Sequence, residues 1–247
     1  MAGLVKHLGY EHLLGGVVLL YLLIIVIPVQ QVGGPLRVAV LGTLLLAAVR
    51  TRRRAGKWAR PAALLAVGAV LATVIAVIVG SETAVTCVSQ ASTVGLVVVT
   101  IVVLAQTLLA AGVIDGPAVR GVLCIYLLLG LLFSAMHGFF APLISDYLKG
   151  VDGQPTQSDT LYFSLITLTT VGYGDITPVA NVARAIASAE ALAGQLYLVS
   201  IVAAVVSRYQ PSRQLRAAAT DATDSDATTR DDSEGSGGAS GDDDTSR

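Results

Sequence analysis

Apolar residues gather in runs that are too long and too little interrupted for an ordinary soluble domain. A helix needs about 20 mainly apolar residues to cross a hydrocarbon core about 30 Å thick. Six runs come close to this length, which predicts an all-α membrane protein with transmembrane helices at residues 13–29, 35–49, 61–80, 92–114, 118–141 and 180–207. The second run is short, and Arg37 near one of its ends is expected to extend to the membrane interface.

A shorter apolar segment, SDTLYFSLITLTT, lies between the last two runs at residues 158–170. About 12 helical residues at 1.5 Å each cover only about 18 Å, so this helix is expected to enter the membrane and turn back. Ser158 or Asp159 is expected to cap its N-terminus. The residues that follow return the chain to the same side. Non-helical backbone at this depth requires burial in protein or a water-filled cavity.

Composition supports a membrane protein and excludes several other classes. The chain is 54% hydrophobic and 13% charged, with a mean hydropathy of +0.72. A net charge of −1 gives no indication of nucleic-acid binding, and none is expected. Cys87 and Cys124 are expected to pack rather than to form a disulfide framework. We find no nucleophile–base pair, metal-ligand cluster or phosphate loop with recognised spacing, so no enzyme is expected.

Basic residues cluster in RTRRRAGKWAR, at residues 50–60, which holds six Lys or Arg and no acid. The positive-inside rule places this loop in the cytoplasm of a cell-membrane protein, and counting spans onward puts residues 142–179 outside. Both termini are then cytoplasmic. The loop is either a topology signal alone or also a contact for anionic lipid headgroups.

The stretch TTVGYGD, at residues 169–175, follows the short apolar segment. Gly172 and Gly174 tolerate positive φ, which lets successive carbonyl groups turn to one side of the chain. Such oxygens can replace the hydration shell of a cation, whose loss costs on the order of 20 kcal/mol for an idealised ion in a low-dielectric medium. One strand encloses nothing, so this chemistry requires a symmetric assembly.

In this setting TTVGYGD resembles the selectivity filter of the tetrameric potassium channel family, of bacterial or archaeal type, and the resemblance covers residues 118–207. It implies a re-entrant pore helix and a selectivity-filter loop between the last two spans. It also implies a homotetramer that conducts K⁺ ions passively. The K⁺ ligands implied by the resemblance are Thr170, Val171, Gly172 and Tyr173.

The resemblance extends to the residues around the filter. Gly174 is implied as a conformational requirement and Asp175 as a residue of the external mouth. Tyr162 occupies the position of a tryptophan that bonds the mouth aspartate in many relatives, which predicts a Tyr162–Asp175 hydrogen bond. Ile166 replaces the glutamate that some bacterial relatives carry behind the filter, so slower or different inactivation is expected.

The last apolar run carries the residues that the resemblance connects with gating. Gly194 lies near the position of the family's inner-helix hinge, and it is either such a hinge or a site of close helix packing. Four residues at helical spacing share one face, either the lining of an inner vestibule or a packing face. These residues are Gln195, Leu198, Val202 and Val206.

Two ionisable residues lie inside predicted spans. Glu190 is expected to bond Ser164 or Thr167 of the short helix, in preference to binding ions. His137, near the outer end of the fifth span, is expected to form an interfacial hydrogen bond, with pH sensing as the alternative.

We therefore predict a four-helix N-terminal membrane domain at 1–114, a pore domain at 115–210 and a disordered acidic cytoplasmic tail at 211–247. The predicted fourth span, 92–114, contains no Lys or Arg, so weak or no intrinsic voltage sensing is expected. Two alternatives to a potassium channel remain. One is a non-conducting membrane scaffold or regulatory subunit. The other is a non-selective cation channel, which is expected to have lost the filter tyrosine or a filter glycine.

Overall fold

A computed structural model describes five ranges of the chain: residues 13–22, 24–25, 30–50, 56–111 and 116–208. These ranges are mainly helical. After an apolar helix at Leu13–Leu22, the helices are α2 (Gln30–Arg50), α3 (Gly56–Val79), α4 (Glu82–Ala111), α5 (Gly116–Phe140), α6 (Gln157–Leu168) and α7 (Asn181–Arg208). A short 3-10 helix at Ala141–Leu143 and two short strands, β1 (Leu148–Lys149) and β2 (Thr177–Pro178), lie between α5 and α7. The predicted disordered tail at 211–247 and residues 51–55 of the basic loop lie outside the described residues.

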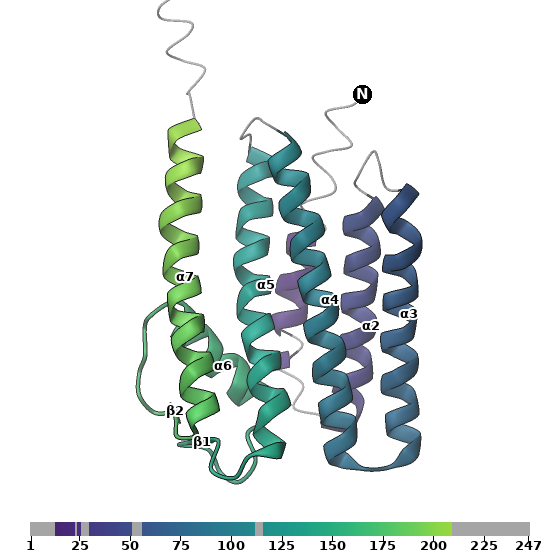
Figure 1. Cartoon of the computed structure of the whole chain (residues 1–247), viewed down its shortest axis with the longest axis vertical. Coiled ribbons are helices and arrows are strands. Elements are labelled where there is room, and N and C mark those ends of the chain that lie inside the picture. The colour runs from purple at the N-terminus through teal and green to yellow at the C-terminus, as the bar shows by residue number, and fades with distance from the viewer. Residues whose placement is uncertain (1–12, 23, 26–29, 51–55, 112–115, 209–247) are drawn as a thin grey trace, which may run out of the picture. The chain divides into compact units, whose positions relative to one another are not determined.

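The long helices from α2 to α5 run side by side in alternating directions (Figure 1). The turn between α3 and α4 lies at the same end of these helices as the strands β1 and β2. The short helix α6 also begins toward this end, after α5 has reached it. The stretch between α5 and α7, taken as a whole, therefore starts and finishes at one end of the bundle (Figure 1).

The described residues contain three helices that are long and apolar enough to cross a membrane, at Pro61–Val79, Glu82–Leu109 and Val119–Leu143. Shorter apolar helices occur at Leu13–Leu22 and Gly34–Val49. These helices fit an all-α membrane protein. A helix is present in each of the predicted apolar runs, whereas the number of membrane crossings stays a prediction.

The helix α4 begins about ten residues before the predicted start at residue 92, which corrects that boundary. Ser81 precedes the helix, and its hydroxyl accepts a hydrogen bond from the Ala84 N–H at 3.4 Å. Hydroxyl groups near the start of the helix bond carbonyls of the helix itself, as Ser89 does to Thr86 and Thr93 to Ser89.

Arg37 is buried inside the bundle, which corrects the prediction that it reaches the membrane interface. It lies about two turns into α2, because that helix begins earlier than the apolar run. Its side chain is only 4% exposed. The guanidinium Nη2 donates to Gln90 Oε1 at 3.2 Å and lies 3.4 Å from Ser89 Oγ. Acceptors on the polar face of α4 therefore hold Arg37 in the interior.

A chain of polar contacts continues from Arg37 to the start of α6. Gln90 donates from Nε2 to Oε1 of Gln157, the first residue of α6. Gln157 Nε2 donates to Ser134 Oγ on α5 at 3.2 Å, and Ser134 lies 3.4 Å from the hydroxyl of Thr160. This Arg37–Thr160 polar chain joins α2, α4, α5 and α6. It ties the N-terminal helices to the helix that precedes the TTVGYGD stretch.

Replacing Gln90 with leucine is expected to destabilise the fold, because the Arg37 guanidinium loses a buried acceptor. Loss of a hydrogen bond to a charged group costs about 1.5–3 kcal/mol. The double variant Arg37→Met/Gln90→Leu is expected to recover most of this loss, since it leaves no buried charge unpaired. Thermal unfolding of the wild type, both single variants and the double variant measures the coupling. If the double variant lost the sum of the stabilities lost by the two single variants, this would contradict an energetic contact between Arg37 and Gln90.

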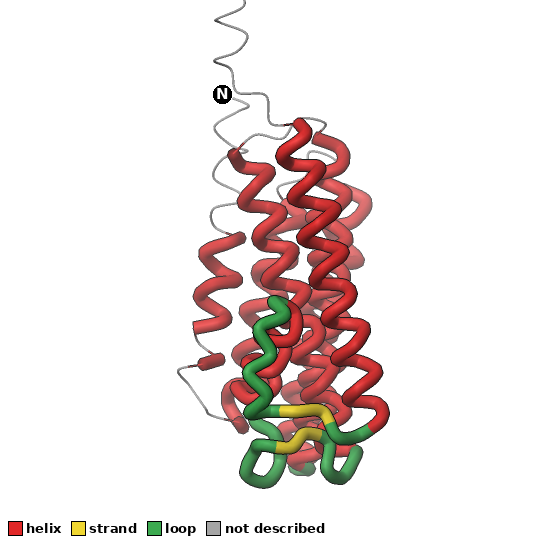
Figure 2. The backbone as a smooth tube through the Cα atoms, turned by 90° about the vertical axis from the view of Figure 1, so that its left-hand side faces the viewer, coloured by secondary structure: helices red, strands yellow, loops and turns green. Residues whose placement is uncertain are grey.

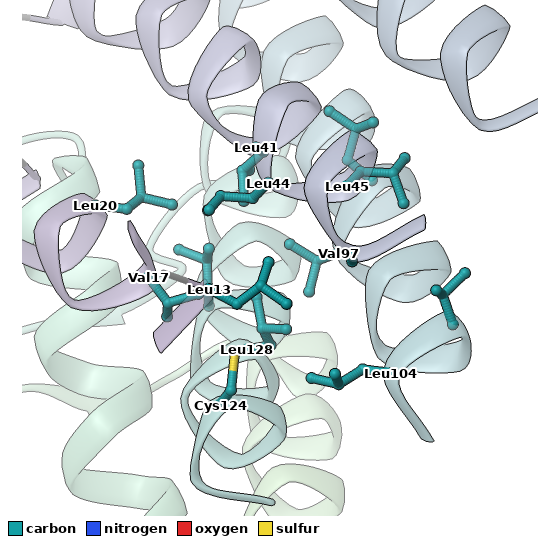
Figure 3. Packing of buried hydrophobic residues seen from close by; sticks show 14 of the residues in the cluster. Leu13, Val17, Leu20, Leu41, Leu44, Leu45, Val97, Leu104, Cys124 and Leu128 are labelled. Atoms are coloured by element: carbon teal, nitrogen blue, oxygen red, sulfur yellow. The ribbon is translucent and has the colours of Figure 1, made fainter. Parts of the chain in front are cut away.

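The main apolar core lies between the helix at Leu13–Leu22, α2, α4 and α5. Figure 3 shows leucine and valine side chains from these segments meeting around Leu128 and Cys124. Cys124 is 2% exposed within this cluster, so the predicted packing role is confirmed for it. A second, smaller cluster packs the start of α7 against Tyr147, Leu148 and Phe163. This second cluster fixes the position of α6 relative to the strands.

Candidate functional site

The short helix α6 is capped by Thr156 rather than by Ser158 or Asp159, which corrects that prediction. The Thr156 hydroxyl accepts a hydrogen bond from the Asp159 N–H at 3.2 Å. In return, Asp159 Oδ2 accepts from the Thr156 N–H at 2.8 Å. This reciprocal pair is a capping box, in which Asp159 is the third residue of the helix. The helix therefore begins at Gln157 and has a rigid first turn.

Residues 169–176 leave the C-terminal end of α6 and return to the strands at the end of the bundle. Figure 2 shows this loop running alongside the helices before it reaches β2. There β2 pairs antiparallel with β1, with Lys149 opposite Thr177, and the Val179 N–H donates to the Tyr147 carbonyl at 3.2 Å. Both ends of the loop are therefore fixed. We call residues 169–175 the TTVGYGD loop.

The backbone of the TTVGYGD loop alternates in conformation. Thr170, Gly172 and Gly174 have φ values of +59°, +52° and +82°, whereas Val171 and Tyr173 between them stay outside the positive region. Alternation of this kind turns successive carbonyl groups toward one side of the chain. For a β-branched residue such as Thr170 a positive φ costs on the order of 1–3 kcal/mol, and such strain clusters at functional sites.

Hydrogen bonds anchor the loop through its N–H groups and leave its carbonyl groups available. The N–H groups of Val171 and Gly172 both donate to the Ile166 carbonyl, at 2.9 and 3.1 Å. Tyr126 of α5 donates to the Leu168 carbonyl at 3.2 Å. Within the described part of the chain, no donor bonds the carbonyls of residues 170–173. These oxygens are free to act as ligands.

Asp175, at the end of the loop that leads into β2, is held by Tyr162, as the resemblance predicts. The Tyr162 hydroxyl donates to Asp175 Oδ2 at 2.7 Å. This hydrogen bond lowers the pKa of Asp175 below its ordinary value. Gly150 packs against the carbonyl of Asp175 so closely that a Cβ would overlap it, and its φ of +94° also requires glycine. The end of the loop beside the strands is therefore tightly fitted.

Replacing Tyr162 with phenylalanine is expected to raise the pKa of Asp175, because the ionised carboxylate loses its donor. In the wild type the lowered pKa adds stability that is present at neutral pH and lost as the pH falls through the pKa of the folded state. The variant should therefore be less stable than the wild type at neutral pH, and this difference in stability should shrink as the pH falls through the pKa of Asp175, which makes the acid limb of the variant shallower. Thermal unfolding across acidic pH, with Tyr162→Phe/Asp175→Asn as control, checks this. Identical acid limbs in the wild type and Tyr162→Phe would contradict it.

The helix α7 passes close to the C-terminal end of α6 at Gly194. A Cβ at Gly194 would collide with the backbone carbonyl of Leu168. This contact favours the close-packing interpretation of Gly194 over the hinge.

At the next residue, Gln195 Nε2 lies 3.3 Å from the hydroxyl of Thr170. The side chain of Leu198 is exposed. Of the predicted vestibule face, the side chains of Val202 and Val206 lie outside the described residues.

Glu190 and His137 lie in one buried cluster. Ser164 Oγ and Glu190 Oε1 are in hydrogen-bond contact, so the expected bond to the short helix is present within a single chain. His137 is fully buried and bonds Tyr147 rather than an interfacial group, which corrects its predicted surroundings.

Several contributors to the site were not predicted. The pattern Thr156-x-x-Asp159 is a capping signature that could have located the start of α6. Gly150 and Tyr147 lie in a segment without periodicity, and no local signal connects them with the loop. Their roles depend on β1 pairing with β2, which is a long-range contact.

A family model described as ion channel matches residues 121–210, which carry most of α5 and all of α6 and α7. No curated protein matches the chain, and no solved structure matches it. The family match supports an ion channel in this part of the chain. It agrees with the apolar helices, since ion channels of this kind are membrane proteins.

Proposed function

We propose that the protein is a potassium-selective channel, in which the TTVGYGD loops of a homotetramer form the filter. The observation that carries the proposal is the alternating backbone of residues 170–174, together with carbonyl oxygens at 170–173 that accept no hydrogen bond from the described residues. Rings of backbone carbonyls replace the hydration shell of K⁺ in channels with this motif. Thr170, Val171, Gly172 and Tyr173 are the proposed ligands, and K⁺ is the permeant ion.

Exposure of the loop supports its role in an assembly. Val171 is 53% exposed and Tyr173 is 73% exposed, although each is a large apolar or aromatic side chain. On α7, Leu192, Leu196 and Val199 are exposed as well. Symmetric copies around one axis would cover these surfaces and bring the carbonyl groups together. In the homotetramer, Gly174 and Asp175 complete each filter and Tyr162 supports it.

Gating is assigned to α7 and not to a voltage-sensing fourth span. Residues 92–114 contain no Lys or Arg to move through the membrane field. Gln195 contacts Thr170 at the inner end of the loop, which supports the assignment of one face of α7 to the ion path. Leu198 follows on that face, and we assign Val202 and Val206 to the same vestibule lining. An apolar constriction of this kind closes by dewetting.

The test combines oligomeric state with ion flux. Native mass spectrometry of the purified protein should give the mass of a homotetramer, and liposomes loaded with K⁺ should show K⁺ efflux down the gradient. Monomers without flux at any voltage, lipid composition or pH would favour the non-conducting scaffold. Equal flux of K⁺ and Na⁺ would favour the non-selective cation channel.

A further inference from the structure

A fully buried cluster joins α5, α6, α7 and the segment before β1. Ser164, Glu190 and His137 have no exposed surface, and Tyr147 is 2% exposed. Ser164 Oγ contacts Glu190 Oε1 and lies 2.7 Å from the carbonyl oxygen of Gly130. His137 Nδ1 lies 2.9 Å from the Tyr147 hydroxyl, and Nε2 lies 3.4 Å from Glu190 Oε2. We call this cluster the Glu190 junction.

The hydrogen bonds of Ser164 determine whether the Glu190 carboxyl group is protonated. The hydroxyl of Ser164 carries one proton, whereas the Gly130 carbonyl can only accept. At 2.7 Å these two oxygens require the Ser164 proton between them. Glu190 Oε1 also contacts Ser164 Oγ, so the second contact needs a proton from the carboxyl group. A carboxylate has none to give, whereas a carboxylic acid does.

The contact between Glu190 and His137 is also consistent with a protonated, uncharged Glu190. Nε2 of His137 and Oε2 of Glu190 have no other partner among the described residues, so they face each other. A neutral His137 with its proton on Nε2 directs that N–H toward Glu190 Oε2 at 3.4 Å and accepts on Nδ1 from the Tyr147 hydroxyl. Each donor then faces one acceptor along the whole path from Tyr147 to Gly130.

If His137 and Glu190 were both charged, fewer of the buried donors would have a hydrogen-bond acceptor. Both nitrogens of a charged His137 would donate, which leaves the Tyr147 proton without an acceptor among the described residues. The N–O separation of 3.4 Å is longer than a neutral or a charge-assisted hydrogen bond, so it does not give two buried charges the close contact that would offset their lost hydration. Removing two charges from water is also costly unless the geometry is excellent.

We propose that Glu190 is a protonated, uncharged positioning residue, which holds α6 against α5 and α7 through one directional chain of donors and acceptors. The chain runs from the Tyr147 hydroxyl through His137, Glu190 and Ser164 to the Gly130 carbonyl. It fixes the helix that leads into the TTVGYGD loop and places no net charge beside it. Its effect on conduction rests on the proposed channel function, whereas the protonation state does not.

The other titratable groups near Glu190 agree with a neutral junction. Tyr21 from the N-terminal helix and Tyr147 from the segment before β1 both lie within electrostatic reach of Glu190. Tyr21 donates its proton to the Leu127 carbonyl at 2.5 Å. Phenols are uncharged at neutral pH, so neither tyrosine supplies the cation that an ionised Glu190 would need.

Infrared spectroscopy of the full-length protein in lipid at neutral pH tests the protonation state. The difference between the wild type and Glu190→Gln should contain the carbonyl stretch of a protonated carboxylic acid. The matched control is Glu82→Gln, since Glu82 is exposed in the first turn of α4 and should give carboxylate bands. Carboxylate bands from Glu190 as well would overturn the proposal. Nitrogen NMR of the unaltered protein should show neutral His137 protonated on Nε2, and a doubly protonated ring would also overturn it.

Conservative substitution tests the positioning role. The side-chain amide introduced by Glu190→Gln can donate to Ser164 and accept from His137, so this variant should keep the wild-type unfolding temperature. Glu190→Leu removes both contacts and should lower the unfolding temperature. If an ion pair held the junction, Glu190→Gln would lose as much stability as Glu190→Leu. Because these readouts do not involve ion flux, failure of the channel proposal would not be confused with failure of this one.

Discussion

Substitution of Gly172 by alanine is expected to abolish selective K⁺ flux while the helices stay folded. Gly172 has a φ of +52°, and a Cβ at this position would meet no atom within 4 Å in the chain. The effect therefore acts through the backbone and not through a steric clash. A left-handed conformation costs an L-residue roughly 1–2 kcal/mol, and this cost recurs in every subunit of the assembly. Relaxation of Gly172 would turn carbonyl groups away from the ion path.

A matched control separates the filter from backbone strain in general. Gly153 has a φ of +76° and also has no atom within 4 Å of an added Cβ, but it lies in the loop between β1 and α6. Gly153→Ala should therefore suffer similar strain and keep selective flux. Flux assays in liposomes with K⁺ and Na⁺ compare the two variants. Equal selectivity in both variants and the wild type would contradict the role of Gly172.

Substitution of Gly194 by alanine is expected to destabilise the contact between α7 and the end of α6. The added Cβ would collide with the backbone carbonyl of Leu168, which cannot move as a flexible side chain can. Overpacking of this kind costs typically about 1–3 kcal/mol. Because Leu168 directly precedes the TTVGYGD loop, displacement of this carbonyl should also disturb K⁺ flux.

The control for Gly194 is Gly68, an exposed glycine inside α3 with no atom within 4 Å of an added Cβ. Gly68→Ala should be neutral or stabilising by roughly 0.5–1 kcal/mol, since alanine favours a helix interior. Thermal unfolding of both variants decides between the two interpretations of Gly194. A hinge predicts that Gly194→Ala gains stability like Gly68→Ala and changes only channel opening. Such a gain would contradict close packing.

The apolar runs were sufficient to predict the helices, because helix length and hydrophobicity are local properties of the sequence. The boundaries were less predictable. The start of α4 was placed about ten residues late, because the prediction followed the apolar run, whereas the more polar turns before it are also helical, with the Ser89 hydroxyl bonded to a helix carbonyl. Arg37 was misplaced for a related reason. Nothing local indicates that the acceptors for its guanidinium lie on another helix.

The loop itself was predictable from its glycines, whereas its supports were not. Gly172 and Gly174 indicate positive φ directly. Thr170 gives no such indication, since a β-branched residue normally avoids that region, and its φ of +59° depends on the surrounding structure. The contacts of His137 and Tyr147 likewise depend on the packing of α5 against the strand segment. Periodicity cannot predict contacts of this kind.

The most direct test of the account is the reversal potential of the purified wild-type protein in a planar bilayer, with K⁺ and Na⁺ present on both sides in equal and opposite gradients. Carbonyl rings formed by the TTVGYGD loops predict a current that reverses near the potassium equilibrium potential and is insensitive to the sodium gradient. A current that reverses near zero, with Na⁺ and K⁺ carried equally, would contradict the proposed filter.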